Sequence, residues 1–246
     1  MTVDSQEDIR KLFAAGRVVR GAFERMKRAA RAGVSTAELD RIGGQYLQSH
    51  GARSAPQLYY DFPGATCISV NEEAAHGIPG PRRLADGDML NIDVSAELAG
   101  YVADMGESFL VGRGTPEQEQ LCYAVKAAVN AAIGKIRSGR SLNVIGKAVQ
   151  KIADKFGYEI VENLGSHGVG NSIHEEPSYI PLDNPSEKRR LEEGLVLTIE
   201  PFFSTGVNWV EEQADGWTLS VNKGDLVAQF EQTLIVTRRG ALVVTA

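Results

Sequence analysis

Four acidic residues lie in apolar segments that have the composition of β-strands: Asp93, Asp104, Glu200 and Glu231. No Lys or Arg occurs from 84 to 112, from 191 to 222 or from 224 to 237, so each acid lies in a stretch without a cation. An ionised carboxylate is costly to bury unless a positive charge compensates it. We therefore expect bound metal to be the partner of these acids. The alternatives are strand ends that face water, or a distant Arg that folds in.

Three of the four histidines stand beside glycine or acidic residues: His76, His167 and His174. Glycines near His167 let the backbone approach a ligand closely, which makes this histidine the best imidazole ligand candidate. A structural hydrogen-bonding role is the alternative for any one of the three. His50 precedes a glycine at a predicted helix end and is assigned no function.

Together, the two Asp, the two Glu and His167 form an oxygen-rich ligand set. Such a set suits two divalent ions, such as Co, Mn, Fe(II) or Zn, better than one tetrahedral structural zinc. In two-metal hydrolases the ions lie about 3.5–4 Å apart, share carboxylates and a water, and polarise the scissile carbonyl. That water loses a proton near neutral pH and becomes the attacking hydroxide. The sequence has no His-Glu-x-x-His pair and is therefore not a zincin, while spacing alone leaves open which acid bridges the ions.

The elements that must position these residues are helix pairs followed by strands. Apolar side chains at helical spacing predict an amphipathic helix over 7–31. Ser35, followed by Glu38 three residues later, is the predicted N-cap of a second helix that ends before Gly51. A further helix is predicted over 117–137, and its successor is predicted to have Ser141 as its N-cap.

The second helix pair repeats the first about 106 residues later, which indicates an internal duplication. The positions that share this offset are Gly33 and Gly139, Ser35 and Ser141, and Gly51 and Gly157. Residues 87–93 match 194–200 at an offset of 107, so Asp93 corresponds to Glu200. We therefore expect one α+β domain over 1–246 with a mainly antiparallel sheet covered by helices. Its halves, about 1–113 and 114–246, would be related by a pseudo-twofold axis; unrelated helices and strands are the alternative.

Composition limits the class of protein further. The formal charge is −6 and the sequence pI about 5.4, which argues against a nucleic-acid binder that neutralises phosphates. Hydrophobic residues make up 43% of the chain and charged residues 24%, as expected of a globular protein with a packed core. No apolar run is long enough for a membrane span, and the N-terminus lacks a signal-peptide pattern. With only two cysteines, we expect a cytoplasmic protein without a disulfide framework.

At these residues the sequence resembles the type I methionine aminopeptidases, which have the pita-bread fold with its curved sheet. The resemblance runs from the first helix to Val236. It rests on an ordered series of motifs: Asn71-Glu72-Glu73-Ala74-Ala75-His76-Gly77-Ile78-Pro79, Asn91-Ile92-Asp93-Val94, His167-Gly168-Val169-Gly170, His174-Glu175-Glu176-Pro177, Thr198-Ile199-Glu200-Pro201, Asp215-Gly216-Trp217 and Ala228-Gln229-Phe230-Glu231. One such motif alone is weak evidence for the resemblance, whereas the whole series in this order is highly specific to the family.

The resemblance implies a role for each candidate residue. It implies that Asp104 and Glu231 bridge two divalent ions, that Asp93 chelates one of them, and that His167 and Glu200 hold the other. By the same resemblance, His76 contacts the scissile amide and helps the departing amine, and His174 hydrogen-bonds the substrate carbonyl or the developing oxyanion. Glu200 would also move a proton from the water to the leaving nitrogen, as expected of a carboxylate tuned by adjacent metal.

The resemblance also implies an apolar pocket for a methionine side chain, with walls formed by Tyr59, Phe62, His76 and Trp217. Several positions depart from the pattern of the family: Pro56, Ala75, Ile173, and Met105-Gly106 after Asp104. None of them is a ligand, so the departures bear on pocket width and not on the class of reaction. The implied activity is removal of the N-terminal methionine from nascent proteins and peptides whose second residue is small.

Other interpretations belong to the same or another class of protein. An Xaa-Pro aminopeptidase shares the metal ligands, but such enzymes usually carry an additional N-terminal domain. A metal-free binding relative would have lost ligands, and here none is lost. Residues 1–32 hold eight Lys and Arg against four Asp and Glu, so this basic helix is a candidate for transient ribosome contact, with a solvated face as the alternative. We expect a monomer whose partners are peptide N-termini, without a nucleic-acid substrate or a membrane.

Overall fold

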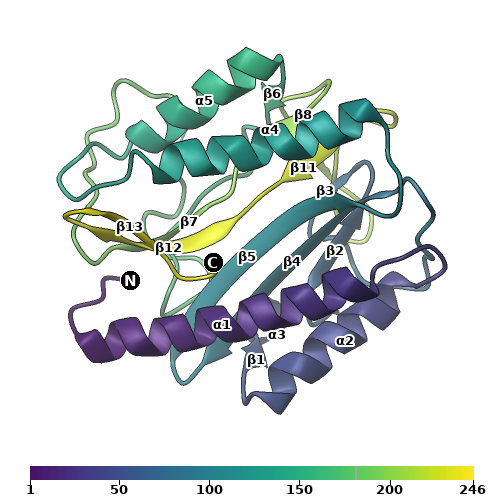
Figure 1. Ribbon diagram of the computed structural model, residues 1–246, viewed down its shortest axis with the longest axis horizontal. Coiled ribbons are helices and arrows are strands. Elements are labelled where there is room, and N and C mark those ends of the chain that lie inside the picture. Colours follow the sequence, from purple (N-terminus) through teal and green to yellow (C-terminus); the bar gives the residue numbers. More distant parts are fainter. Residues whose placement is uncertain (181) are drawn as a thin grey trace.

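The computed structural model describes residues 1–180 and 182–246 (Figure 1). Its helices are α1 (Gln6–Ala29), α2 (Thr36–Ser49), α3 (Ala55–Tyr60), α4 (Pro116–Ile133) and α5 (Val144–Phe156). The side chain of Ser35 caps α2 by accepting from the backbone N–H of Glu38, as predicted. Within the described residues, every helix is too short or too polar to span a bilayer.

The strands form small antiparallel sheets around one long hairpin. In the first half of the chain they are β1 (Arg53–Ser54), β2 (Cys67–Val70), β3 (Glu73–Ala75), β4 (Met89–Leu98) and β5 (Tyr101–Leu110). In the second half they are β6 (Glu159–Ile160), β7 (Val196–Ile199), β8 (Phe202–Ser204), β9 (Glu211–Glu212), β10 (Leu219–Ser220), β11 (Val227–Gln229), β12 (Gln232–Thr237) and β13 (Gly240–Val243). Every strand pair among the described residues is antiparallel, in agreement with the predicted, mainly antiparallel sheet.

The hairpin of β4 and β5 runs through the middle of the molecule (Figure 1). Its turn, Ala99-Gly100, has φ values of 51° and 87°, and two-residue turns with positive φ match the twist of antiparallel strands. In the resulting register Asp93 pairs with Gly106, and Asp104 pairs with Ser95. Because side chains alternate between faces, Asp93 and Asp104 lie on the same face of the hairpin.

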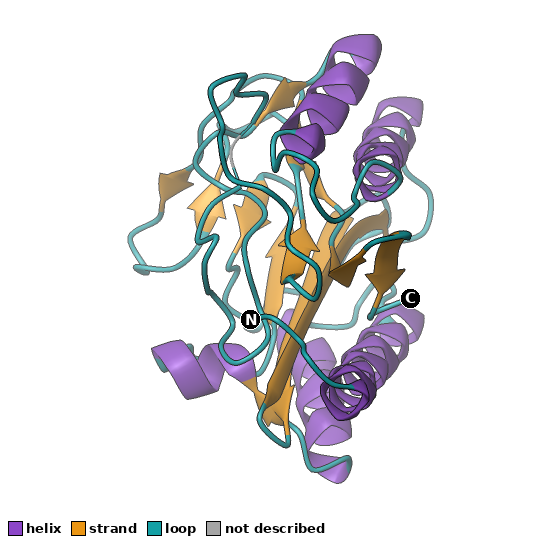
Figure 2. Cartoon of the chain, turned by 90° about the vertical axis from the view of Figure 1, so that its left-hand side faces the viewer, coloured by secondary structure: helices purple, strands orange, loops and turns teal. Residues whose placement is uncertain are grey.

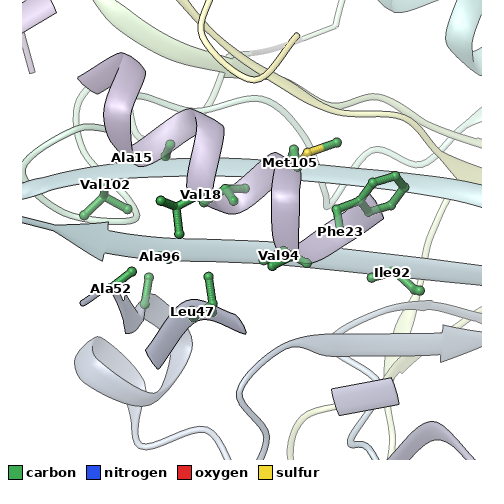
Figure 3. Close-up of a cluster of buried hydrophobic side chains, with 14 of the residues drawn as sticks. Ala15, Val18, Phe23, Leu47, Ala52, Ile92, Val94, Ala96, Val102 and Met105 are labelled. Carbon is green, nitrogen blue, oxygen red and sulfur yellow. The ribbon is translucent and has the colours of Figure 1, made fainter. Parts of the chain in front are cut away.

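Helices cover one side of the strands. Figure 2 shows the four long helices on one side of the sheet and the short α3 on the other. On the side of α1, Val18 and Phe23 pack against Val94 and Met105 of the hairpin (Figure 3). On the side of α4 and α5, a second cluster joins Leu121 and Val129 to the strands β7 and β12. The opposite face of the hairpin, which bears the two acids, is thereby left for the site.

The two helix pairs make matching contacts with the segments that follow them. Arg83 Nη1 donates to the carbonyl of Gly33 at 2.6 Å, and Arg190 Nη1 donates to the carbonyl of Gly139 at 2.7 Å. Gly33 and Gly139 have φ values of 89° and 83°, a left-handed conformation that glycine adopts without strain. These equivalent positions are the ones at which the sequence repeats.

Some predicted boundaries differ from the structure. The helix expected over 117–137 ends at Ile133, and the helix expected to start after Ser141 begins at Val144. The prediction of Ser141 as its N-cap is wrong, because the N-cap is Asn143 and the Ser141 hydroxyl accepts from the backbone N–H of Asn143. The Ser141 oxygen stabilises the turn before the helix, a local use of serine that competes with capping.

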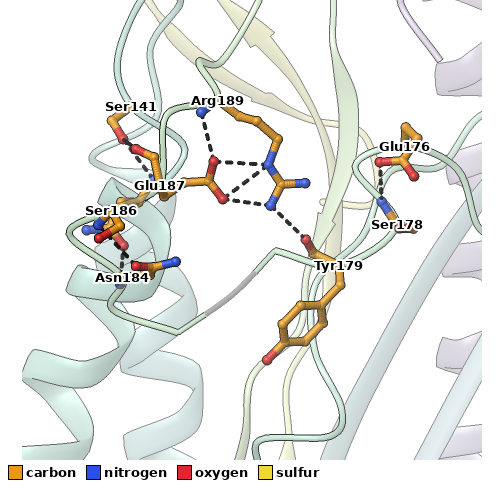
Figure 4. A network of polar contacts seen from close by, with 9 residues as sticks. Ser141, Glu176, Ser178, Tyr179, Asn184, Ser186, Glu187 and Arg189 are labelled. Atoms are coloured by element: carbon orange, nitrogen blue, oxygen red, sulfur yellow. Dashed lines mark hydrogen bonds and ion pairs between the residues drawn. The ribbon is translucent and has the colours of Figure 1, made fainter.

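A surface segment connects His174 to β7. Arg189 fixes part of it, since its Nη2 donates to the carbonyl of Tyr179 at 3.2 Å and to Glu187 Oε2 at 2.7 Å (Figure 4). Closer to His174 along the chain, the Glu176 carboxylate accepts from the backbone N–H of Ser178. These contacts all join residues within the segment itself.

Candidate active site

A cavity of about 220 Å³ opens over the acidic face of the hairpin. It combines carboxylates, imidazoles and apolar groups, and its lining residues are Pro56, Tyr60, Phe62, Cys67, His76, Asp93, Ser95, Asp104, His167, Ile173, His174, Glu200 and Trp217. Glu231 lies beneath this surface and is 1% exposed. The structure therefore brings the predicted ligands and histidines, which span more than half of the chain, into one region.

The described residues contain a group able to hold a cation at the base of this cavity. Asp104, His167 and Glu231 each offer one ligand atom, and these atoms lie within 4.8 Å of one another. Asp93 is next to Asp104 on the hairpin, and Glu200 contacts His167, with 2.9 Å between Glu200 Oε1 and His167 Nε2. The five predicted ligands are thus neighbours.

Backbone contacts between the two halves bring Glu231 to Asp104. The backbone N–H of Asp104 donates to Thr233 Oγ1 at 2.9 Å, and the same hydroxyl donates to the carbonyl of Asp104 at 2.7 Å. The backbone N–H of Glu231 donates to the carbonyl of Gly106 at 2.8 Å. Glu231 lies between β11 and β12, and these hydrogen bonds hold this segment beside β5.

The carboxylates repel one another in this buried environment. Burial and the charge of Glu200 raise the pKa of Asp93 to about 7. Burial, together with the charges of Asp93 and Glu200, raises the pKa of Asp104 well above its usual range. The pKa of Glu231 is raised in the same way, by burial and by Asp104 and Glu200. A site of this kind stores unfavourable charge that a cation relieves.

The donor set fits a divalent metal centre. Asp104 Oδ1 and Glu231 Oε1 are buried and have no hydrogen-bond partner within the described residues. Buried polar atoms in proteins are almost always paired, so neighbouring carboxylate oxygens without a hydrogen-bond partner fit a site that binds a cation. Oxygen donors with one imidazole suit Mn, Fe(II), Co or Zn.

His167 is held from the second half of the chain. Its backbone N–H donates to Thr198 Oγ1 at 3.2 Å, and its carbonyl accepts from the backbone N–H of Thr198 at 2.7 Å. A Cβ on the following Gly168 would lie 2.4 Å from the carbonyl oxygen of Glu176, so only glycine fits there. Glycine at this position admits another segment of the chain, so the predicted approach of a ligand to the backbone near His167 stays a prediction. Burial lowers the pKa of His167, but the charge of Glu200, the hydrogen bonds to Glu200 and to the Gly168 carbonyl, and the charge of Asp93 together raise it.

The other two histidines are neutral at physiological pH. Burial lowers the pKa of His76, with Glu200 opposing this shift. Burial and the neighbouring His167 lower the pKa of His174 to about 4. The rings of His167 and His174 have centroids 4.3 Å apart. Both neutral imidazoles line the cavity, where they can donate or accept a hydrogen bond without adding charge.

The apolar wall differs from the prediction at one residue. Phe62, His76 and Trp217 line the cavity as expected, and Phe62 meets Trp217 edge to face with ring centroids 5.2 Å apart. Tyr59 is not in the lining; its hydroxyl donates to the carbonyl of Asn171 at 2.9 Å, and Tyr60 occupies the wall. Consecutive residues of a helix point about 100° apart, and in the one-turn α3 the pattern of the sequence does not decide which tyrosine faces inward.

Several lining residues had no predicted role. Pro56 and Ile173, noted in the sequence only as departures from a family pattern, both line the cavity, whereas Ala75 does not. Tyr60 places its hydroxyl oxygen 2.6 Å from His174 Nδ1. The presence of a second tyrosine beside Tyr59 was the one available signal for this contact.

The chain matches known proteins along almost its whole length. Residues 10–238 match the model of metallopeptidase family M24. Methionine aminopeptidase 2 of Bacillus subtilis (strain 168) is 41% identical over 251 residues, covering 100% of this chain and 99% of the relative. Among solved structures, methionine aminopeptidase from Rickettsia prowazekii superimposes with a TM-score of 0.95 at 31% identity, and each chain is covered completely.

A more distant structure shares the fold alone. Prolidase from Pyrococcus furiosus superimposes with a TM-score of 0.79 at 22% identity, and the match covers 100% of this chain and 65% of the prolidase. With the closer matches, this likeness confirms the predicted α+β pita-bread fold. Because residues 10–238 match the family model and the whole chain is similar to methionine aminopeptidases, the chain belongs to metallopeptidase family M24.

Proposed function

We propose that this protein is a type I methionine aminopeptidase, which hydrolyses the bond after an N-terminal methionine when the second residue is small. The observation that carries the proposal is that buried carboxylate oxygens without a hydrogen-bond partner in the described residues adjoin a cavity lined by apolar side chains and by the imidazoles of His76 and His174. The whole-length likeness to the Bacillus subtilis methionine aminopeptidase supports the same substrate class.

Asp93, Asp104, His167, Glu200 and Glu231 would hold two divalent ions, of which Co, Mn, Fe(II) and Zn are the candidates. Such ions supply Lewis acidity at the scissile carbonyl and lower the pKa of water. Asp104 and Glu231 are the acids with an unpaired oxygen each, which supports a shared role for them. Their raised pKa values mean that cation binding and loss of protons from the site occur together.

The chain's own residues provide the proton and hydrogen-bond chemistry. The Tyr60 hydroxyl oxygen lies 2.6 Å from His174 Nδ1. When the hydroxyl is the donor in this contact, the ring proton of His174 lies on Nε2, from which it donates to the substrate carbonyl as negative charge develops there. Burial raises the pKa of Tyr60, which keeps this donor protonated. His76, also neutral, contacts the scissile amide, and Glu200 moves a proton from water to the leaving nitrogen.

Substrate selection follows from the walls of the cavity. The edge-to-face pair of Phe62 and Trp217 gives an apolar surface suited to the unbranched, polarisable side chain of methionine. Ile173 and the ring of Tyr60 extend the apolar lining toward His174.

The decisive experiment compares two peptides on one protein preparation. Met release from Met-Ala-Ser is measured after loading with Mn, Fe(II) or Co, and again after chelation with EDTA. We expect release with metal and none after chelation. Absence of release with all three metals would overturn the proposal, and proline release from Met-Pro instead would favour the Xaa-Pro class, with which the chain shares its fold.

We propose further that the chain is one domain of two related halves, about 1–113 and 114–246. The matching bonds of Arg83 to Gly33 and of Arg190 to Gly139 support a common origin. The substrates are peptide and nascent-protein N-termini, and the protein acts as a cytoplasmic monomer.

Transient ribosome contact would use the basic face of α1. Lys27 is paired with Glu107 at 3.0 Å and Arg20 with Glu24 at 2.9 Å, whereas Arg17 on α1 and Arg31 just beyond its end have no ion pair within the described residues. Substitution of the four cations followed by ribosome pelleting tests this contact, and unchanged co-sedimentation rejects it.

A further inference from the structure

Gln229 lies under the cavity, in contact with two of the proposed metal ligands. It ends β11, is 1% exposed, and precedes Glu231 by two residues. Its Nε2 donates to Glu231 Oε2 at 3.0 Å and to Glu200 Oε2 at 3.3 Å. One amide group thus uses its two N–H bonds on carboxylates that come from different loops.

The orientation of this amide is fixed from behind. Asn91 Nδ2 donates to Gln229 Oε1 at 2.8 Å and to Ser108 Oγ at 3.1 Å. Ser108 Oγ also accepts from the backbone N–H of Gln229 at 2.9 Å. Because Asn91 presents donors to Gln229 Oε1, the Gln229 NH₂ group must point at the carboxylates. All three side chains are buried, so water does not compete for these bonds.

Gly106 provides the space that this arrangement needs. It stands on β5 opposite Asp93, and a Cβ at this position would lie 2.2 Å from Gln229 Oε1. Any larger residue would push the amide away from its present place. Gly106 is one of the positions that depart from the family pattern in the sequence.

The contacts divide the oxygens of Glu231 between two tasks. Oε2 accepts from Gln229, whereas Oε1 is buried without a partner in the described residues. A neutral amide donor holds the carboxylate in place without cancelling its charge, as an Arg or Lys would. Glu231 is thereby oriented and remains available to a cation.

We propose that Gln229 is a positioning residue of the metal centre, which holds Glu200 and Glu231 in their metal-binding orientation with one N–H each. Asn91 and Ser108 set the direction of the amide. The inference rests on the proposed function in that it takes Glu200 and Glu231 as metal ligands. Groups that hydrogen-bond to metal ligands typically contribute about 10–100-fold to metal affinity.

The test is a metal titration of the chelated protein by calorimetry with Mn(II), and by visible absorption with Co(II). Gln229→Met keeps the length of the side chain and removes both donors. We expect at least about tenfold weaker binding and an altered Co(II) spectrum. Gln213→Met makes the same change at an exposed position and serves as the control, with wild-type affinity and spectrum.

A second variant tests the chain of amides. Asn91→Leu removes the donor to Gln229 Oε1 but touches neither carboxylate, and we expect a smaller loss of affinity in the same direction. Thermal unfolding of each chelated variant establishes that it folds. Wild-type affinity and spectrum in a folded Gln229→Met protein would overturn the inference. This outcome is distinct from failure of the proposed function, in which wild-type protein binds metal but releases no methionine.

Discussion

The hydroxyl oxygen of Tyr60 lies 2.6 Å from Nδ1 of His174, although the two residues are 114 positions apart in the chain. Their rings are inclined by 50°, with centroids 5.6 Å apart. The contact joins α3 of the first half to the loop that carries His174 in the second half. With the Tyr60 hydroxyl as the donor, the ring proton of His174 lies on Nε2.

Replacement of Tyr60 by Phe removes this hydroxyl and keeps the aromatic wall. His174 is then free to take either tautomer, and only one of them donates from Nε2. We expect kcat for Met-Ala-Ser to fall roughly tenfold with little change in KM, because proton placement is lost and apolar contact is kept. Tyr123→Phe, at an exposed tyrosine on α4, is the matched control. An unchanged kcat in Tyr60→Phe would show that the hydroxyl does not orient His174.

Replacement of Asp104 by Asn removes one buried charge without changing the shape of the side chain. We expect loss of activity and a lower metal content per chain, since an amide is a poorer ligand and does not provide the charge that holds a divalent ion. Metal content is measured by atomic absorption after gel filtration. Asp154→Asn, on the exposed face of α5, is the control. Full activity in Asp104→Asn would contradict a shared role for this acid.

Chelated protein should lose stability as the pH rises. Burial and Glu200 raise the pKa of Asp93 from 3.8 to about 7, so the folded state holds this proton where the unfolded state has released it. The resulting stabilisation is fully present below pH 3.8 and is lost as the pH passes through about 7. We expect the Tm of protein in EDTA to fall by several degrees from pH 5 to pH 8. A Tm that rises over this interval would contradict the assigned charge state.

Bound metal should oppose the loss of stability at high pH. A cation that binds only the folded state stabilises it by mass action, and it binds more tightly when the carboxylates are ionised. We therefore expect the increase in Tm on adding Mn(II) to be larger at pH 8 than at pH 5. Thermal unfolding followed by circular dichroism measures both series on the same protein. An equal increase in Tm at pH 5 and at pH 8 would show that metal binding does not depend on ionisation of the buried acids.

Shortening Phe62 to Ala should open the apolar wall. Phe62 is buried and packs on Trp217, so its loss removes contact surface for methionine and leaves a space beside the indole. We expect kcat/KM for Met-Ala-Ser to fall roughly 10–100-fold, equivalent to about 1–3 kcal/mol, with a smaller loss for Leu-Ala-Ser. Equal losses for the two peptides would mean that this wall does not select the first residue.

The acids of the site were recognisable in the sequence because carboxylates in cation-free apolar strands are costly. The helix pairs are predictable because their apolar periodicity and the glycines that follow them recur at an offset of about 106 residues. The sequence does not predict which way a side chain points in a helix of one turn. Tyr59 is expected in the cavity wall, and Tyr60 lines it instead. Serine side chains cap helices and also stabilise turns, so the residue type alone does not decide whether Ser141 is an N-cap. The role of Gln229 depends on an amide orientation set by residues on two other strands, which no local pattern reveals.

The division of the proposed ligands between the two proposed halves has a thermodynamic consequence. Asp93 and Asp104 belong to one hairpin and are placed by its Ala99-Gly100 turn, whereas His167, Glu200 and Glu231 come from the second half. An ion held by both sets is a tether between the halves. Docking of the halves and occupancy of the centre are then linked equilibria, and each strengthens the other by the same factor.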